Sequence, residues 1–341
     1  MSERQPRLVV QSAPFLRQGV TTPGLMRDVL LALAPVLAMA VWYFGLSALL
    51  VTAAATLGAV GTEALFAGTR RLADGSALLT GLILGLTLPP ALPLWMAFLG
   101  GAVGIGLGKL IWGGLGHNLF NPALIGRAFL QAAFPISLTT WSRPAELFTL
   151  RPGNFAWPLM QPPPQPDAMT AATPLNVMKF DGQMTPLGDL LRGQIAGSLG
   201  ETSALVILLA GVFLIARRAF DWRIPTSILA TVAVFSGVLY AVDPGRFPSP
   251  LFMLLSGGLM FGAVFMATDP VTSPLAPRGA WIFGAGVGVL VVLIRVWGGM
   301  PEGVMYAILL MNGATPLIER ATQQRAFGRR RSGGTLAREK S

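Results

Sequence analysis

Two asparagines stand three residues apart in the segment "GHNLFNPALIGRAFL" (116–130), where most other side chains are apolar. Asn121 precedes Pro122, and asparagine followed by proline is typical of a helix N-terminus, because the amide accepts from the first free N–H groups. Asn118 and Asn121 are therefore predicted either to cap a helix only, or to cap it and also bind a ligand. A flat heterocycle with alternating carbonyl and N–H edges, such as an isoalloxazine ring, would satisfy both amides.

Charged residues near apolar segments give further candidates. Asp269 in "FMATDPVTSPLAPRG" (265–279) is predicted to cap a proline-broken stretch, which is either an ordinary turn or a re-entrant element lining a cofactor or ion path. Glu63 lies near the end of an apolar segment and is a second candidate for an ion path. Lys109 and Arg295 are expected to extend toward the membrane interface. Glu201 is expected to stabilise the N-terminus of the helix that follows it.

Two threonines lie in "MTAATPLNVMKF" (169–180), within the long polar stretch of the chain. Thr173 precedes Pro174, so its backbone is predicted to be extended. Its small neighbours would leave the hydroxyl accessible to a modifying enzyme. On residue types alone the stretch is a solvated turn, and an attachment point for a group is the alternative.

The composition limits the chemistry. Of 341 residues, 53% are hydrophobic and only 12% are charged, which indicates a membrane protein. There is no cysteine, and His117 is the single histidine, so disulfides, thiolate metal sites, iron–sulfur clusters and bis-histidine haem are excluded. A redox function would need an organic cofactor, and no metal site is expected. The Gly100, Gly104 and Gly108 series is predicted to be a helix-packing face and not a phosphate loop.

The apolar segments predict an all-α integral membrane protein with about ten transmembrane helices, some of them broken or re-entrant. The segments are 25–45, 47–67, 76–91, 93–112, 122–138, 202–216, 224–241, 250–267, 281–297 and 303–319. If successive apolar segments cross the membrane in alternating directions, most of the 25 basic residues lie on the same side of it. Because basic residues are enriched on the cytoplasmic side, this predicts cytoplasmic N- and C-termini and an external loop. This distribution follows membrane topology and argues against nucleic-acid binding.

The organisation that follows has five parts. They are a cytoplasmic N-terminal segment (1–24), a first membrane half (25–138), an external loop (139–200), a second membrane half (201–319) and a basic cytoplasmic tail (320–341). The segments "SALLTGLILG" (76–85) and "SALVILLAGV" (203–212) resemble each other and begin on opposite sides. This predicts an inverted repeat, which places binding sites at discontinuous helices and is also typical of secondary transporters.

Several motifs in order resemble one protein family, and the likeness extends from about residue 20 to 328. They are "DGSALLTGLILGLTLPP", "HNLFNPALIGRAFL", "DAMTAATPL", "GETSALVILLAGVFLI", "FMATDPVTSPL" and "YAILLMNGATPLIER". The family comprises the D subunit of the Rnf electron-transport complex and the B subunit of the sodium-pumping NADH:quinone oxidoreductase. The short segment before the first span favours the Rnf branch.

The resemblance implies a fold related to urea and ammonium channels. It also implies a covalent FMN, joined through its phosphate to a threonine in a Ser/Thr-Gly-Ala-Thr motif outside the membrane. On this sequence the motif is Thr170-Ala171-Ala172-Thr173 followed by Pro174, and Thr173 is the attachment residue. Ala171 stands where the motif has glycine; a left-handed backbone there would cost roughly 1 kcal/mol or more. Thr315 in "NGATPLIER" (312–320) is the competing position, within the last predicted span.

The resemblance further implies a non-covalent flavin, riboflavin, for which Asn118 and Asn121 are the matching residues. The expected function is that of a subunit of an ion-translocating oxidoreductase (a translocase), not catalytic alone, which couples ferredoxin/NAD electron transfer to movement of Na⁺ or H⁺ across a bacterial inner membrane. The implied partners are the other subunits, including a second FMN-carrying subunit and iron–sulfur subunits, and a flavin transferase. The alternative is a urea/ammonium-type channel or secondary transporter without a redox role.

Overall fold

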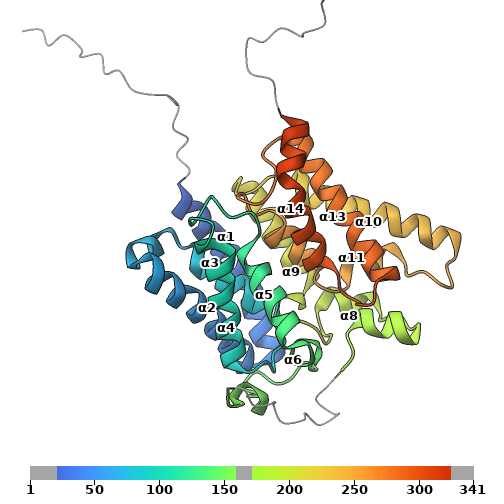
Figure 1. Ribbon diagram of the computed structural model, residues 1–341. Coiled ribbons are helices and arrows are strands. Elements are labelled where there is room, and N and C mark those ends of the chain that lie inside the picture. The colour runs from blue at the N-terminus through green and yellow to red at the C-terminus, as the bar shows by residue number, and fades with distance from the viewer. Residues whose placement is uncertain (1–20, 159–170, 324–341) are drawn as a thin grey trace, which may run out of the picture.

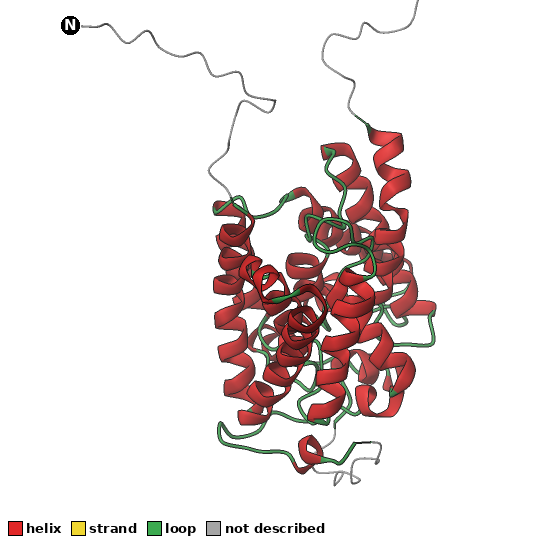
Figure 2. Cartoon of the chain, turned by 60° about the vertical axis from the view of Figure 1, so that its left-hand side comes forward, coloured by secondary structure: helices red, strands yellow, loops and turns green. Residues whose placement is uncertain are grey.

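A computed structural model describes residues 21–158 and 171–323, which form helices and loops with no β-strand among them (Figure 2). Thr170 and most of the N-terminal segment and of the basic tail lie outside these residues. Four helices are long and apolar enough to cross a membrane: α1 (Thr22–Phe44), α2 (Leu46–Ala67), α10 (Arg223–Val242) and α13 (Pro277–Trp297). Shorter apolar helices include α3 (Ser76–Leu86), α4 (Leu94–Ile105) and α9 (Ala204–Ala216). The chain is a multi-pass membrane protein.

The remaining helices are short or broken, apart from α14. They are α5 (Pro122–Ala133), α6 (Pro135–Thr139), α7 (Pro174–Asn176), α8 (Leu187–Arg192), α11 (Pro250–Leu255), α12 (Leu259–Phe261) and α14 (Val304–Thr322). Short 3₁₀ or π turns are η1 (Thr69–Asp74), η2 (Gly106–Leu110), η3 (Pro152–Phe155), η4 (Val177–Asp181), η5 (Leu199–Glu201) and η6 (Gly262–Met266). Each apolar segment expected from the sequence coincides with one or more of these elements.

The first half of the described chain, α1 to α6, forms one group of helices and α9 to α14 forms the other (Figure 1). In the first group α2 packs on α3 and α4. Gly58 of α2 lies directly on the backbone of Phe98 in α4, so that this contact has no room for a side chain. The face of Gly104 and Gly108 packs on α5: a Cβ on these residues would lie 2.8 Å from Pro122 O and 2.7 Å from Pro122 Cα. The predicted helix-packing role of these glycines is confirmed.

In the second group α10 packs on α13, where Gly284 and Gly288 bring the two backbones together. The helix from residue 250 is interrupted at Ser256, and Gly257 there has a φ of 66°, which favours glycine. The two groups meet where α1 contacts α9 and where α5 contacts α14. One continuous apolar core extends through both groups.

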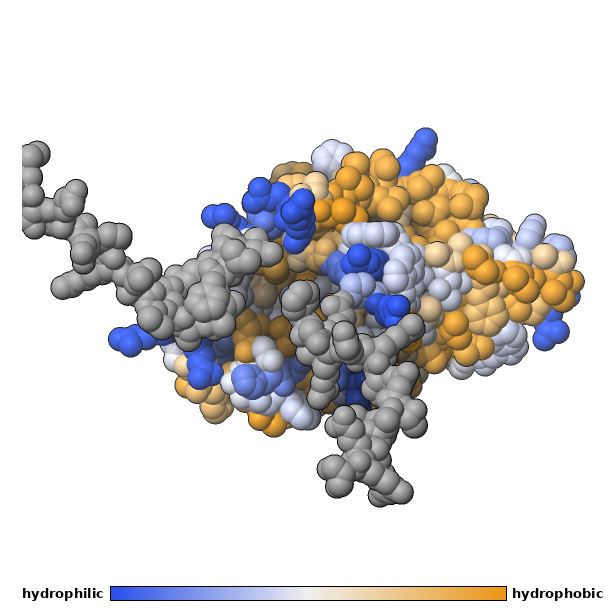
Figure 3. Space-filling model, turned by 90° about the horizontal axis from the view of Figure 1, so that it is seen from above, coloured by the Kyte–Doolittle hydropathy of each residue, from blue (hydrophilic) through white to orange (hydrophobic). Residues whose placement is uncertain are grey.

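The two ends of the molecule carry different segments. The first described residues of α1 and the last of α14 lie at the same end, and residues 140–158 lie at the opposite end (Figure 1). We call these the terminal end and the loop end. Seen from the terminal end, hydrophobic side chains occupy much of the visible face, and hydrophilic groups lie both near its middle and at its edges (Figure 3). At the loop end, a small cluster of Leu175, Leu190, Ile195 and Phe252 attaches the segment after residue 171 to α11.

Candidate functional site

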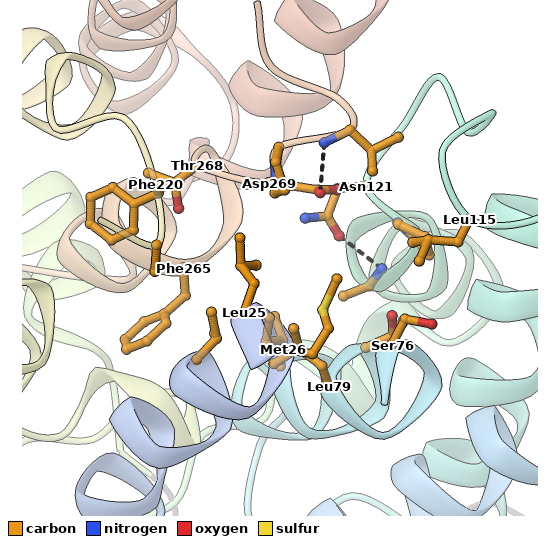
Figure 4. Close-up of a pocket in the computed structure, with 18 of the residues that line it drawn as sticks. Leu25, Met26, Ser76, Leu79, Leu115, Asn121, Phe220, Phe265, Thr268 and Asp269 are labelled. Carbon is orange, nitrogen blue, oxygen red and sulfur yellow. Dashed lines mark hydrogen bonds between the residues drawn. The ribbon is translucent and has the colours of Figure 1, made fainter. Parts of the chain in front are cut away.

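A pocket of about 70 Å³ opens between α1, α3, the start of α5 and the turn after η6. We call it the asparagine pocket. Its walls include Leu25, Met26, Leu79 and Phe265, and its polar groups come from Asn118, Asn121, Thr268 and Asp269 (Figure 4). The structure therefore brings together three residues that the sequence singled out, from segments about 150 positions apart.

Asn121 forms hydrogen bonds that connect three elements around this pocket. Its Oδ1 accepts from Ala123 N (2.9 Å) and Leu124 N (3.4 Å), so it caps α5 as predicted, with Pro122 in the first turn. Its Nδ2 donates to Met266 O (3.2 Å). With the Asn312 amide oriented to donate to Ile308 O, its oxygen accepts from Asn121 N (3.1 Å). Asn121 thus joins α5 to η6 and α14, and its side-chain amide is already engaged at both ends.

Asn118 differs in this respect. Its side chain is 5% exposed, and Nδ2 donates to Phe120 O (3.3 Å). Oδ1 has no partner among the described residues although it is buried. A buried carbonyl oxygen without a donor costs roughly 1–3 kcal/mol, so this atom is available to a ligand N–H group.

Asp269 caps the turn that follows η6. Oδ1 accepts from Val271 N (3.1 Å), and Oδ2 accepts from the Thr272 hydroxyl (3.3 Å). The segment between η6 and α13 is a short irregular turn at the pocket wall, and the hydrogen bonds of Asp269 stabilise it.

Glu63 and Lys109 form an ion pair inside the first helix group. Lys109 Nζ donates to Glu63 Oε1 (2.5 Å) and to Ser76 Oγ (2.6 Å), and Asp74 Oδ2 lies 3.9 Å away. Lys109 is 2% exposed, so the expectation that it extends to the interface is wrong. Its position on the π turn η2 turns the side chain inward, where Glu63 and Asp74 supply the compensating charge. Lys109 and Ser76 also line the asparagine pocket, which places Glu63 one contact from it.

A second pocket, of about 150 Å³, lies nearer the loop end. We call it the carboxylate pocket. Polar groups of Arg127, Ser198, Glu201 and Glu302 meet apolar and aromatic side chains there; these are Trp141, Phe261, Met266, Met300, Met305 and Tyr306. Since Met266 lines this pocket and Phe265 lines the asparagine pocket, η6 separates the two.

Glu201 and Glu302 form a hydrogen-bonded carboxyl pair in the carboxylate pocket. Glu302 Oε1 accepts from Gly258 N (2.7 Å), and its Oε2 lies 3.4 Å from Arg127 Nη2. Burial, and then the charge of Glu302, raises the pKa of Glu201 to about 8. Glu201 was expected to stabilise the start of α9, but the cap there is Ser203, whose Oγ accepts from Val206 N (3.5 Å). The helix begins after Ser203, which leaves Glu201 in η5 to face the pocket.

Arg295 is also buried, with 1% exposure, so its expected extension to the interface is wrong. Its guanidinium donates to Met253 O (2.6 Å) and Ser256 O (2.9 Å), the carbonyls that the interruption after α11 leaves without helical partners. The charge thereby stabilises the broken helix beside the carboxylate pocket.

Thr173 caps the start of the short helix α7, whose last residue, Asn176, lines the carboxylate pocket. Thr173 has φ −69° and ψ 157°, the extended conformation predicted from Pro174. Its Oγ1 accepts from Asn176 N (3.2 Å), and the residue is 8% exposed, so the hydroxyl is less accessible than the sequence indicated. Ala171 N donates to Trp141 O (3.1 Å).

The backbone of Ala171 does not need glycine. Among the described residues, Arg218 is the only non-glycine residue with a positive φ, so Ala171 does not adopt the left-handed conformation. Ala172 is exposed and Pro174 is buried in the first turn. Thr315, the competing threonine, is buried within α14, where its hydroxyl donates to Thr272 O (3.0 Å) and Met311 O (3.1 Å).

Comparison with known proteins shows the family of the chain. Residues 9–328 match the model of the NQR2, RnfD, RnfE family. The chain belongs to this family. It is 42% identical to the D subunit of an ion-translocating oxidoreductase complex from Stutzerimonas stutzeri, over 92% of this chain and 94% of the relative. It is 39% identical to the D subunit of a proton-translocating ferredoxin:NAD(+) oxidoreductase complex from Clostridium ljungdahlii, over 94% and 96%. It is also 39% identical to the D subunit of a Na(+)-translocating ferredoxin:NAD(+) oxidoreductase complex from Acetobacterium woodii, over 94% and 95%.

The family resemblance stated from the motifs is thus confirmed. Sequence reasoning missed three residues of the site: Arg127 and Glu302 line the carboxylate pocket, and Asn312 holds the backbone of Asn121. Arg127 and Asn312 each lie in a quoted motif, and their polar side chains in apolar segments were the available signal. Glu302 lies in "GGMPEGV" between two predicted spans, where no local pattern distinguishes it from a solvated loop residue.

Proposed function

We propose that the chain is the D subunit of an Rnf-type ion-translocating complex, in which it holds flavins on an electron path coupled to Na⁺ or H⁺ movement. The observation that carries the proposal is the identity of about 40% with D subunits, which covers more than nine-tenths of both chains. Two of the named relatives belong to ferredoxin:NAD(+) oxidoreductase complexes. By this proposal, the chain is one subunit of a complex that carries out the same reaction.

Its fold is an inverted repeat of the urea/ammonium-channel type with about ten spans. Helix packing supports the pairing of α1–α5 with α9–α14, because α2 packs on α4 as α10 packs on α13. The contacts α1–α9 and α5–α14 lie between equivalent elements in this pairing. The sequence likeness of 76–85 to 203–212 would make α3 and α9 equivalent helices of the two repeats. The order of the helices along the chain instead makes α3 equivalent to α11.

The terminal end faces the cytoplasm and the loop end faces the periplasm. Arg70 and Arg71 in η1, and Arg217 and Arg218 after α9, agree with a cytoplasmic terminal end. Residues 139–200, which contain Thr173, then belong to the periplasmic side, where a flavin transferase has access.

Thr173 carries a covalent FMN as a phosphoester. Two contacts support this proposal: Thr173 Oγ1 accepts from the backbone of Asn176, and Ala171 N donates to the backbone of Trp141. Both Asn176 and Trp141 line the carboxylate pocket. Trp141 and Tyr306 supply aromatic surface for a flat ring, and Arg127 supplies positive charge. When bound there, the flavin would exchange electrons one at a time with neighbouring cofactors. The chain's own residues orient it and exclude water.

Riboflavin occupies the asparagine pocket. The buried, partnerless Oδ1 of Asn118 accepts from a ring N–H group, and Asn121 holds the pocket wall in place. The apolar walls of Leu25, Leu79 and Phe265 suit the body of the ring. Glu63 and Asp269, close to this pocket, belong to the ion path, with Lys109 neutralising Glu63.

Iron–sulfur clusters lie on partner subunits, because the chain has no cysteine to bind them. The nicotinamide site is assigned to a partner subunit as well. The other partners that we propose for the chain are a second FMN-carrying subunit and the flavin transferase.

The test is flavin fluorescence of the denatured chain on a gel, after expression with the complex and its flavin transferase. The wild-type band and a Thr315→Val band should both fluoresce, and a Thr173→Val band should be dark. A dark wild-type band would refute the covalent FMN. Fluorescence retained in Thr173→Val but lost in Thr315→Val would move the attachment to α14.

A further inference from the structure

Glu201 is a buried acid with no cation paired to it among the described residues. It takes part in none of the ion pairs of that part of the chain, whereas Glu302 is paired with Arg127. Glu201 is 9% exposed. Its two carboxyl oxygens lie close to the glycines Gly197 and Gly258: if these residues had a Cβ atom, it would be 2.7 Å from Oε2 and 3.2 Å from Oε1, respectively. Water therefore has little access to this carboxyl group.

One of its polar partners is another carboxyl group. Oxygens of Glu201 and Glu302 both lie close to Gly258, and the two side chains share a hydrogen bond. Two ionised carboxylates have only acceptors, so they cannot form this bond without a proton between them. Like charges at this distance also oppose the ionisation of both groups.

The groups around the pair favour one proton and oppose a second. Glu302 accepts from Gly258 N at one oxygen and is paired with Arg127 at the other, so it stays ionised. Arg127 of α5, Arg295 of α13 and Ser198 before η5 are the other charged or polar groups that act on Glu201. Arg295 donates to backbone carbonyls, which leaves its charge acting on Glu201 only at longer range.

We propose that Glu201 and Glu302 form a proton-binding site in the carboxylate pocket, with the proton held on Glu201 and shared with Glu302. The site lies at the loop end of the molecule, on the opposite side of η6 from the asparagine pocket and its acids, Glu63 and Asp269. The chain thus provides a place to bind a proton from the side that carries residues 139–200. The site needs no flavin, so it stands or fails independently of the attachment at Thr173.

The experiment is a pH titration of the purified complex by attenuated total reflection infrared spectroscopy, which follows the C=O stretch of protonated carboxyl groups. At constant ionic strength, one band should be lost as the pH rises, with a midpoint well above the usual range of a glutamate carboxyl group. Glu201→Gln should abolish this band. Glu319→Gln, which alters a carboxylate bonded to Leu275 N at the terminal end, should retain it.

Two further variants give opposite shifts. Glu302→Gln removes the negative neighbour and should lower the midpoint by about one pH unit or more, and Arg127→Gln removes a cation and should raise it. Size-exclusion chromatography shows which variants assemble. An assembled Glu201→Gln complex that keeps the band, a wild type without a titrating band, or a Glu302→Gln midpoint that does not fall would each overturn the proposal.

Discussion

Glu63 and Lys109 lie 46 positions apart and form a buried ion pair, with 2.5 Å between Glu63 Oε1 and Lys109 Nζ. Their side chains are 1% and 3% exposed. Removal of one partner leaves the other charge buried and uncompensated, and such changes cost roughly 3–5 kcal/mol. Lys109→Met should therefore lower the thermal unfolding temperature of the purified protein strongly.

The double variant tests whether charge compensation is the reason. Glu63→Gln combined with Lys109→Met removes both charges and should recover most of the lost stability. Arg217→Met is the matched control, because it breaks an ion pair with Asp28 in which Arg217 is 53% exposed. The expected loss there is below about 1 kcal/mol. Equal losses of stability in Arg217→Met and Lys109→Met would show that burial does not determine how much an ion pair contributes to stability.

Two glycines of α2 provide a test of helix packing. A Cβ on Gly58 would collide with the backbone of Phe98, and a Cβ on Gly61, on the next turn, would have no atom within 4 Å. Gly58→Ala should destabilise the α2–α4 contact by about 1–3 kcal/mol. Gly61→Ala should be neutral or stabilise by up to about 1 kcal/mol, because alanine is the better helix former. Thermal unfolding in detergent measures both, and similar values for the two would contradict the packing argument.

The sequence predicted features that depend on local chemistry. Asn121 before Pro122 forms the cap that this pair indicates, because the cap needs only its own first turn. Thr173 is extended for the equally local reason that Pro174 follows it. The apolar segments identified all the long helices, since residence in lipid imposes a composition that can be read without knowledge of any tertiary contact.

Features that depend on distant partners could not be predicted. The inward direction of Lys109 depends on Glu63, and that of Arg295 depends on carbonyls freed where α11 ends. Glu201 was assigned to a helix N-terminus because acids are favoured there, but Ser203 moved the start of α9 beyond it. The pairing of Glu201 with Glu302 joins residues about a hundred positions apart, and nothing in either local sequence indicates it.

Asn118 offers a prediction for the asparagine pocket. Its Oδ1 has no partner among the described residues, whereas the Asn121 amide is fully engaged in structure. Asn118→Ala should weaken the affinity for non-covalent flavin by about tenfold or more and so lower the flavin retained per protein, because a buried oxygen left without a donor costs roughly 1–3 kcal/mol and about 1.4 kcal/mol is a factor of ten. Flavin released by acid and quantified by fluorescence measures it.

The unfolding temperature separates ligand binding from folding at this position. Asn118→Ala should unfold at nearly the wild-type temperature in flavin-depleted protein, because removal of the unsatisfied oxygen offsets the loss of the bond from Nδ2 to Phe120 O. Asn121→Ala should unfold earlier, by the roughly 0.5–2 kcal/mol of a lost helix cap. Full flavin content in Asn118→Ala would remove this residue from the ligand site.

Lys179 holds the segment that carries Thr173 against the end of α13. Its Nζ donates to Arg295 O (3.0 Å), Gly298 O (2.5 Å) and Met300 O (3.1 Å), carbonyls at or beyond the helix C-terminus. Hydrogen bonds to a charged group contribute roughly 1.5–3 kcal/mol in stability. Lys179→Met keeps the apolar stem and removes the donors, so it should release residues 171–182 locally.

Amide hydrogen exchange resolves this local effect. In Lys179→Met, peptides from residues 171–182 and from 296–302 should exchange at least tenfold faster, because about 1.4 kcal/mol of local stability corresponds to a factor of ten. Peptides from α2 and α4 should not change, since neither helix contacts Lys179 through its described bonds. Arg246→Met, which removes a cation beside Phe247 at an exposed turn, is the control for a change of charge alone. If exchange rises throughout the protein, Lys179 supports the whole fold; if it rises nowhere, the apolar cluster around Leu175 is sufficient to hold the segment.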